Sequence, residues 1–316
     1  MSENITNSFL HPTEFILVGF SGIEDTQKWL SIPFFIMYIT AITGNTITLS
    51  VIITEQSLHQ PMYIFISMLA AVDILLVIST LTKLLGILWF NAKAIIFEAC
   101  VMQMFLIHCL TALNSTLLVI MSFDRYIAVC HPFIYPSVVT GKFIAAAGIL
   151  ALVRSVGFIL PLPFFVVSFP YCATNTLSHC YCEYFAIANI FCADIAVSTA
   201  YIQSLFFLLT MPDNFLVGLS YIMILRVILK MKTKEARQKA ISTSSSHFLV
   251  VVIFHVFAIL SYLLYSSPPY LRILASVLFI VIPSTLNPFI YSFRMKEIRL
   301  RITKLFHLWA FATVTK

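Results

Sequence analysis

The chain has 316 residues, of which 60% are hydrophobic and only 10% are charged, whereas a soluble globular protein carries about 25% charged residues. Phe alone occupies 29 positions, and the net charge is +6. A soluble core cannot cover that much apolar surface, which excludes a soluble domain, a disordered chain, a collagen-like fibre and a nucleic-acid-binding domain. The composition predicts a multispanning membrane protein.

Seven apolar stretches reach the length of about 20 residues that a helix needs to cross a bilayer. Backbone in contact with lipid must satisfy its own hydrogen bonds, and these stretches do not alternate as barrel strands would, so we expect helices. The predicted fold class is therefore all-α, a seven-transmembrane helix bundle. The stretches cover roughly residues 29–53, 61–86, 98–126, 143–166, 197–229, 240–265 and 271–292.

The distribution of Lys and Arg predicts the orientation of the bundle. Most of them follow the third, fifth and seventh stretches, whereas the opposite loops hold only Lys28, Lys93 and Arg272. The positive-inside rule then places the N-terminus outside and the C-terminus in the cytosol. The net charge thus reflects topology, and the basic rim could also contact anionic lipid.

The chain divides into three parts: an extracellular segment (1–28), the membrane domain (29–292) and a cytosolic segment (293–316) with a short amphipathic helix. The apolar run in the first part, residues 15–18, is too short for a cleaved signal peptide. Asn4 opens an Asn-Ile-Thr glycosylation sequon on the side expected to face the lumen. We expect no second folded domain.

Five of the seven cysteines are expected on the outer side, where disulfides are the default. Five cannot all pair, and the residues alone leave the pairing open. An alternative is that the run His179-Cys180-Tyr181-Cys182-Glu183 binds a soft metal, although bridging is the more frequent fate of such cysteines. The five are Cys100, Cys172, Cys180, Cys182 and Cys192.

Polar residues at bilayer depth are costly and are therefore functional candidates. Asp73 lies in the middle of the second stretch, and Asn45, Asn114 and Asn287 lie at similar depth. They predict either a hydrogen-bonded packing cluster or a hydrated ion or proton site that changes with conformation.

Two further motifs combine polar groups with helix ends or breaks. Asp124-Arg125-Tyr126 ends the third stretch, where the charged pair either extends to the membrane surface or acts as a switch. Asn287-Pro288 followed by Tyr291 places a helix-breaking Pro beside a side chain that can cap the freed backbone group, which predicts a hinge.

Together these motifs resemble a known family. The Gly44-Asn45 pair, Asp73, Cys100, Asp124-Arg125-Tyr126 and Asn287-Pro288-x-x-Tyr291 resemble the rhodopsin-like G-protein-coupled receptors. Longer motifs resemble the odorant receptor branch over residues from about 10 to 305. They are Leu58-His59-Gln60-Pro61-Met62-Tyr63, Met121-Ser122-Phe123-Asp124-Arg125-Tyr126-Ile127-Ala128-Val129-Cys130-His131-Pro132, Ser220-Tyr221, the Ser- and Thr-rich run from Lys239 to His247, and Pro283-x-x-Leu286-Asn287-Pro288-Phe289-Ile290-Tyr291.

Phe123 and the stretch Gln103–His108 resemble the class I, or fish-like, odorant receptors. The resemblance implies two disulfides, Cys100–Cys182 and Cys172–Cys192, with Cys180 left unpaired. It also implies a plasma-membrane receptor, in the cilia of olfactory neurons, that couples to a stimulatory olfactory G protein and raises cyclic AMP. Coupling and activation would then involve Asp73, Asp124, Arg125, Tyr126, Tyr221, Asn287, Pro288 and Tyr291.

The chain departs from the class I pattern at three positions. Asn114 stands where an acidic residue is usual, which weakens an ion site at Asp73. His255 stands where the sixth helix usually has a Tyr, and could replace its hydrogen bond. Ser266 stands where some relatives have an Arg that anchors carboxylates, and this loss makes a fatty acid ligand less expected.

A small volatile ligand needs an apolar cavity with one or two polar anchors. We expect this cavity in the outer halves of the third, fifth, sixth and seventh helices. His108, Thr111 and Ala112 lie one helical turn apart and share a face. His108 is either a polar anchor for the ligand or a structural histidine satisfied by the outer loop, and we favour the cluster over any single member. The candidates are His108, Thr111, Ala112, Tyr201, Ser204, Leu205, His255, Ile259 and Tyr262.

Three rival functions remain. A small-solute transporter predicts inverted repeats and broken half-helices, and neither is apparent in the sequence. An enzyme predicts a catalytic motif, and the sequence has no His-Glu-x-x-His, Gly-x-Ser-x-Gly or phosphate loop. The third rival is a chemoreceptor for an endogenous metabolite outside the nose, and its sequence would look the same as that of an odorant receptor. We expect no catalytic residue, no metal and no cofactor.

Overall fold

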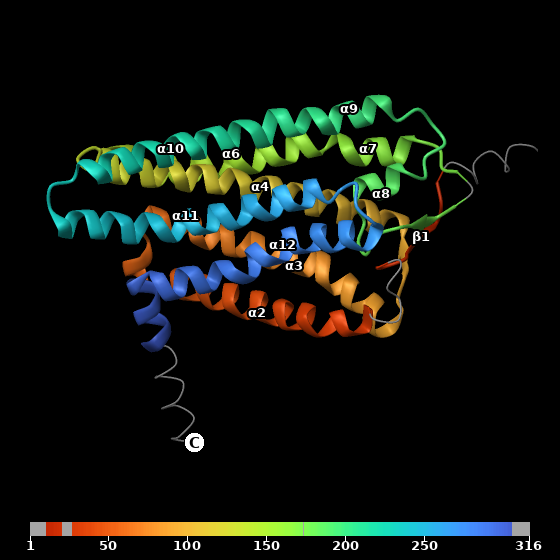
Figure 1. Cartoon of the computed structure of the whole chain (residues 1–316), viewed down its shortest axis with the longest axis horizontal. Coiled ribbons are helices and arrows are strands. Elements are labelled where there is room, and N and C mark those ends of the chain that lie inside the picture. Colours follow the sequence, from red (N-terminus) through yellow and green to blue (C-terminus); the bar gives the residue numbers. More distant parts are fainter. Residues whose placement is uncertain (1–10, 21–26, 173, 305–316) are drawn as a thin grey trace, which may run out of the picture.

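The computed structural model is an elongated bundle of helices that run along a common axis and connect at its two ends (Figure 1). It describes residues 11–20, 27–172 and 174–304. Within these residues, seven helices are long and apolar enough to cross a membrane. They are α2 (Gln27–Thr54), α3 (Pro61–Phe90), α4 (Phe97–Cys130), α6 continued by α7 (Gly141–Ile159 and Pro161–Ser168), α9 continued by α10 (Ala196–Leu205 and Met211–Lys230), α11 (Lys234–Leu263) and α12 (Pro269–Arg294).

The predicted number of spanning helices is confirmed, and their predicted limits are close. The largest difference is at α11, which begins at Lys234 and not near residue 240. Residues 234–239 are charged or polar apart from Ala236, so they were not counted in the apolar stretch. They can still be helical, because the part of a helix that lies outside the hydrocarbon does not need to be apolar.

Helix ends follow local signals. Pro61 and Pro269 open α3 and α12, where a missing backbone N–H costs nothing. Asn91 ends α3 in the left-handed conformation (φ 53°) and its N–H bonds the carbonyls of Gly86 and Ile87. The Thr140 side chain caps α6 by accepting from the N–H of Phe143.

Between α9 and α10 the chain makes a π-helical turn, Phe206–Thr210. Pro212 is the second residue of α10, and Pro has no N–H for the carbonyl four residues earlier. A wider turn is a common accommodation of such a break, and it changes which side chains of α10 face the bundle.

At one end, called here the disulfide end, two bridges and a small sheet tie the loops together. Cys100 pairs with Cys182 and Cys172 with Cys192, and Cys180 is free and buried, as the resemblance implied. The disulfide removes Cys182 from the ligands of the metal-binding alternative.

The sheet was not predicted. It consists of β1 (Glu14–Leu17), β2 (Ala94–Ile96) and β3 (Thr176–Leu177), with β1 in the middle. The apolar run that begins at Phe15 is therefore a strand: Phe15 and Leu17 are fully buried under the loops. A two-residue or three-residue strand has too short a pattern to be recognised in sequence.

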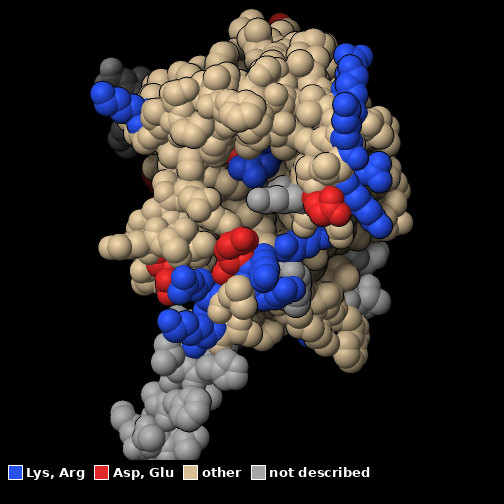
Figure 2. Space-filling view, turned by 90° about the vertical axis from the view of Figure 1, so that its left-hand side faces the viewer, with Lys and Arg blue, Asp and Glu red and all other residues tan. Residues whose placement is uncertain are grey.

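The opposite end, called here the basic end, carries most of the exposed cations. Figure 2 shows Lys and Arg gathered along one margin and across the lower half of this end. After α12, the described residues 296–304 form a further helix, which agrees with the predicted short C-terminal helix. Asn4, the predicted glycosylation site, lies outside the described residues.

Inside the bundle, α3, α4 and α12 are more deeply buried than α2, α6 with α7, and α10. The approach of α2 to α12 is especially close. A Cβ on Gly44 would lie 2.8 Å from Cγ of Pro288, so only glycine fits there. Small residues allow such contacts between membrane helices.

Candidate ligand-binding site

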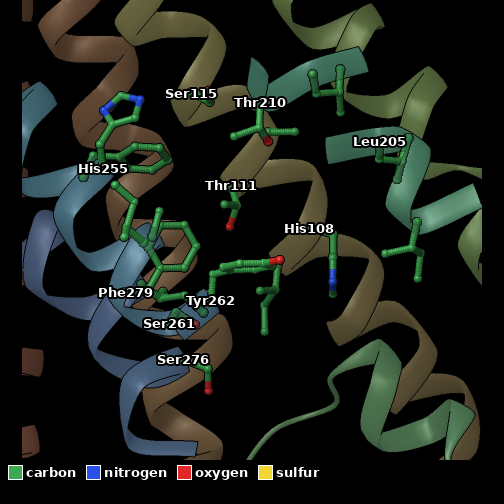
Figure 3. A pocket seen from close by; sticks show the side chains of 18 of the residues that line it. His108, Thr111, Ser115, Leu205, Thr210, His255, Ser261, Tyr262, Ser276 and Phe279 are labelled. Atoms are coloured by element: carbon green, nitrogen blue, oxygen red, sulfur yellow. The ribbon is translucent and has the colours of Figure 1, made fainter. Parts of the chain in front are cut away.

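A cavity of about 860 Å³ lies between α4, α9 with α10, α11 and α12, towards the disulfide end. Its volume is within the range of small-molecule sites, about 300–1,000 Å³. Figure 3 shows His108 and Thr111 of α4 facing Tyr262 of α11 and Phe279 of α12 across this space. Most of the predicted ligand residues line the cavity: His108, Thr111, Ala112, Leu205, His255, Ile259 and Tyr262.

Two of the predicted ligand residues, Tyr201 and Ser204, do not line the cavity. The Tyr201 hydroxyl donates to the carbonyl of Phe158 (2.6 Å), and the Ser204 hydroxyl donates to the carbonyl of Tyr201 (2.6 Å). Phe158 lies in the last turn of α6, whose carbonyls lack intrahelical donors. This bond turns Tyr201 towards α6, and Ile202, Leu205 and Leu209 face the cavity instead.

Two histidines of the cavity have a defined hydrogen-bonding state. Nδ1 of His108 is 2.8 Å from the carbonyl of Met104, and Nδ1 of His255 is 2.7 Å from the carbonyl of Val251. A carbonyl can only accept, so each Nδ1 carries a proton, and Nε2 is the nitrogen left for a ligand. His108 is thus held by its own helix, not by the outer loop.

The roof of the cavity is formed by the loop that follows Cys172. His179 and Tyr181 line the cavity and are buried. Nδ1 of His179 accepts from the N–H of Tyr181 (3.4 Å), so Nε2 carries the proton and donates to Oγ of Ser276 on α12 (3.2 Å). Burial and the nearby charge of Arg272 lower the pKa of His179 to about 3, so the ring is neutral at pH 7.

The cavity also contains a cation that sequence reasoning placed in an outer loop. Arg272, in the first turns of α12, lines the cavity, whereas Ser266 does not. Its guanidinium carbon lies 5.9 Å from the centre of the Tyr265 ring. A cation therefore borders the cavity although position 266 is Ser.

A partly buried ion pair at the side of the cavity was also missed. Nη2 of Arg154 on α6 lies 2.9 Å from Oδ1 of Asp213 on α10. Oγ of Ser115 donates to Asp213 (2.7 Å), and Arg154 also donates to Oγ1 of Thr116 (2.5 Å). Asp213 is an acidic residue inside an apolar span, and that signal was available in the sequence.

The Asp73 cluster is present. Asp73 accepts hydrogen bonds from Asn114 (3.1 Å), Ser284 (2.9 Å) and Asn287 (2.7 Å). Asn45 does not reach Asp73; its amide donates to the carbonyl of Ser284 (2.9 Å). A small cavity of about 10 Å³, bordered by Thr111 and Asn114, lies between the large cavity and this cluster.

At the basic end of α4, Arg125 forms an ion pair with Asp124. Asp124 is fully buried and also accepts from the Tyr135 hydroxyl (2.8 Å). The Tyr126 hydroxyl lies 3.1 Å from Nε2 of His131, in an exposed contact.

Two tyrosines from the predicted activation set lie near the same end. Tyr221 of α10 hydrogen-bonds to His247 of α11 and so links these two helices. The Tyr291 hydroxyl of α12 is buried and has no hydrogen-bond partner among the described residues. Pro288, one turn earlier in α12, packs against Gly44.

The family model of the olfactory receptors matches residues 34–308. The chain is 41% identical over 301 residues to olfactory receptor 51E1 of Homo sapiens, with 94% of each chain covered. It is 38% identical over 309 residues to olfactory receptor 52K2 of Homo sapiens, with 96% of this chain and 98% of that one covered. Squid rhodopsin superposes with a TM-score of 0.71 at 18% identity, over 90% of this chain and 86% of that chain.

The chain therefore belongs to the olfactory receptor family, and its fold is that of the rhodopsin-like G-protein-coupled receptors. It is a multi-pass membrane protein. Members of this family are receptors and not enzymes, so the enzyme and transporter alternatives are set aside.

Proposed function

We infer that the chain is an odorant receptor that binds a small volatile molecule in the large cavity and activates a stimulatory olfactory G protein, which raises cyclic AMP. The observation that carries this proposal is the arrangement along α4. His108 and Thr111 line the cavity near one end of this helix, and the Arg125–Asp124 pair closes the other end.

In the proposed mechanism, ligand binding favours a second state in which the basic end of α11 moves away from the bundle. The Tyr221–His247 contact rearranges, and Arg125 leaves Asp124 to line a cleft for the G protein. The ligand can shift this equilibrium only by its difference in affinity for the two states.

The topology belongs to the same proposal. The basic end faces the cytosol and the disulfide end faces outside, since cations gather at the former and disulfides require an oxidising compartment. The site of action is the plasma membrane, in the cilia of olfactory neurons.

The chemistry of the cavity favours ligands that carry a hydroxyl group. With the proton of His108 and of His255 held on Nδ1, Nε2 of the imidazole is an acceptor, which matches the hydroxyl of an alcohol and not the carbonyl of a ketone or ester. A carboxylic acid would instead depend on Arg272 as its cation.

The experiment measures cyclic AMP in cells that display the chain, challenged with alcohols, ketones, esters and acids of one carbon skeleton. Surface display is quantified in the same cells. We expect alcohols to act at the lowest concentrations. His108→Phe should weaken the response to alcohols about tenfold, the loss of one hydrogen bond of about 1.4 kcal/mol, whereas Arg272→Gln should affect only acids.

Arg125→Ala is the control for coupling. It should abolish every ligand response at unchanged surface display, because Arg125 is remote from the cavity and close to the proposed G-protein cleft. Full cyclic AMP responses in this variant would contradict the mechanism.

A further inference from the structure

The large cavity is not closed on the side of the bundle between α10 and α11. Several of its lining residues on these helices are also exposed: Met211 is 47% exposed and Ile259 57%. Gly218 of α10 and Val252 of α11 also belong to the lining and are exposed. Because these residues lie on two neighbouring helices, line the cavity and are exposed, we read them as the border of an opening between α10 and α11.

This opening lies at membrane depth. Gly218 is roughly 18 Å along α10 from Lys230, at a rise of about 1.5 Å per residue, and so within a hydrocarbon layer of about 30 Å. The neighbouring exposed side chains of both helices are apolar. They include Phe215, Leu219 and Ile222 on α10 and Val256 on α11. The opening therefore faces acyl chains and not water.

The roof at the disulfide end offers a different environment. His179 and Tyr181 are 3% and 4% exposed, and the Cys100–Cys182 bridge holds this loop against α4. Arg272 and Glu183 also line the cavity there. An uncharged apolar molecule that entered from water would have to pass a packed loop and charged groups.

We propose that uncharged ligands which partition into the membrane reach the cavity from the bilayer, through the opening between α10 and α11, and that Gly218 keeps this opening wide. The inference rests on the proposed function for the identity of the cavity as the ligand site. Such a route selects for ligands that dissolve in lipid before they contact any polar anchor.

Gly218 has no side chain to obstruct the opening, and a Cβ built there meets no atom within 4 Å. A larger residue is therefore compatible with the backbone and would occupy the opening. Gly157 on α6 is a matched control. It is exposed, a Cβ there also meets nothing within 4 Å, and it does not line the cavity.

The experiment places a reporter thiol in the cavity with Thr111→Cys and follows its modification in lipid nanodiscs. The probes are N-phenylmaleimide, which is uncharged and partitions into lipid, and a trimethylammonium methanethiosulfonate, which is charged and stays in water. The chain without the introduced cysteine gives the background from Cys109, Cys130 and Cys180. Gly218→Phe and Gly157→Phe are then each combined with the reporter.

We expect the reporter to react with the maleimide and to be protected from the charged reagent. Gly218→Phe should slow the maleimide reaction about tenfold, equivalent to about 1.4 kcal/mol in the barrier, and Gly157→Phe should leave it within about twofold. Val252→Phe narrows the opening from the α11 side and should slow the maleimide reaction as Gly218→Phe does. Agreement between the two variants shows that the effect does not come from misfolding of one of them.

Two results would overturn the proposal. One is equal maleimide rates in all three Phe variants, and the other is modification by the charged reagent as fast as by the maleimide. The assay uses neither an agonist nor a G protein. A failure here therefore leaves the odorant receptor proposal intact, and a receptor that fails to signal can still show entry through the lipid.

Discussion

At the scale of single residues, the polar groups of the interior are held in defined protonation states by their neighbours. His179 is the clearest case, since both ring nitrogens are used: Nδ1 accepts from the N–H of Tyr181 and Nε2 donates to Ser276. The Ser276 hydroxyl in turn donates to the carbonyl of Ile273 (2.8 Å). A second proton on the ring would break this chain of bonds.

We expect acid to loosen the roof of the cavity through His179. Because the pKa is lowered to about 3 in the folded chain and is near 6.5 when unfolded, the unfolded chain takes up the proton first. Stability is complete above about pH 6.5 and falls as the pH drops towards 3, with about 2 kcal/mol lost by pH 5. Thermal unfolding of the purified chain at pH 7.5 and pH 5 measures this loss.

His179→Asn should reduce the pH dependence, and His59→Asn serves as control because His59 is exposed at the other end of the bundle. Equal pH dependence in the parent chain and in His179→Asn would show that other groups cause it.

The Arg154–Asp213 pair gives a second prediction at this scale. Arg154→Met should destabilise the chain by about 3 kcal/mol, because it leaves the charge of Asp213 buried with Ser115 as its remaining strong donor. Arg154→Met combined with Asp213→Met should recover most of the loss, because no buried charge is left. The unfolding temperatures of the three chains in detergent test this order, and a double variant less stable than the single one would contradict it.

At the scale of elements, one contact sets the distance between α2 and α12. Gly44 lies against Pro288, and the Asn45 amide beside it bonds the carbonyl of Ser284. Ser284 also donates to Asp73. The close approach therefore supports the Asp73 cluster as well as the packing of the two helices.

Gly44→Ala should separate these helices and destabilise the chain by about 1–3 kcal/mol, the usual cost of overpacking. Gly157→Ala is the matched control, since its added Cβ meets nothing within 4 Å, and alanine there should leave stability unchanged or slightly higher. Surface display and unfolding temperature measure both. The contact is unimportant if the two variants behave alike.

At the scale of the whole molecule, the two ends of α4 connect the cavity to the basic end. The Arg125–Asp124 pair, supported by Tyr135 of the short helix α5 (Tyr135–Val138), closes that end in the structure. A substitution that weakens the Arg125–Asp124 pair should therefore favour the proposed signalling state even when no ligand is bound.

Asp124→Asn should raise basal cyclic AMP, because Arg125 loses its charge partner. A change of about 1.4 kcal/mol would increase the population of the signalling state about tenfold. Tyr135→Phe removes only one hydrogen bond to Asp124 and should have a smaller effect. Basal cyclic AMP at the parent level in Asp124→Asn, with equal surface display, would argue against a closing role for the pair.

The membrane class, the seven helices and the motifs that place the chain in its family are all readable from the sequence. The reason is that crossing a bilayer requires long apolar helices, and their length and composition are directly visible. Asn114 and Asn287 beside Asp73 were also predictable, because polar groups inside lipid must find one another. Ser284, the third donor to Asp73, was not predicted, and Asn45 bonds a backbone carbonyl instead.

The tertiary structure alone decided which face of each helix lines the cavity. In a soluble helix the polar face reveals the orientation, but lipid and protein interior are both apolar, so the sequence of α9 did not distinguish Ile202 from Tyr201. Arg154 and its partner Asp213 come from distant parts of the chain, and so does Arg272. Only the packing of the helices brings these groups to the cavity.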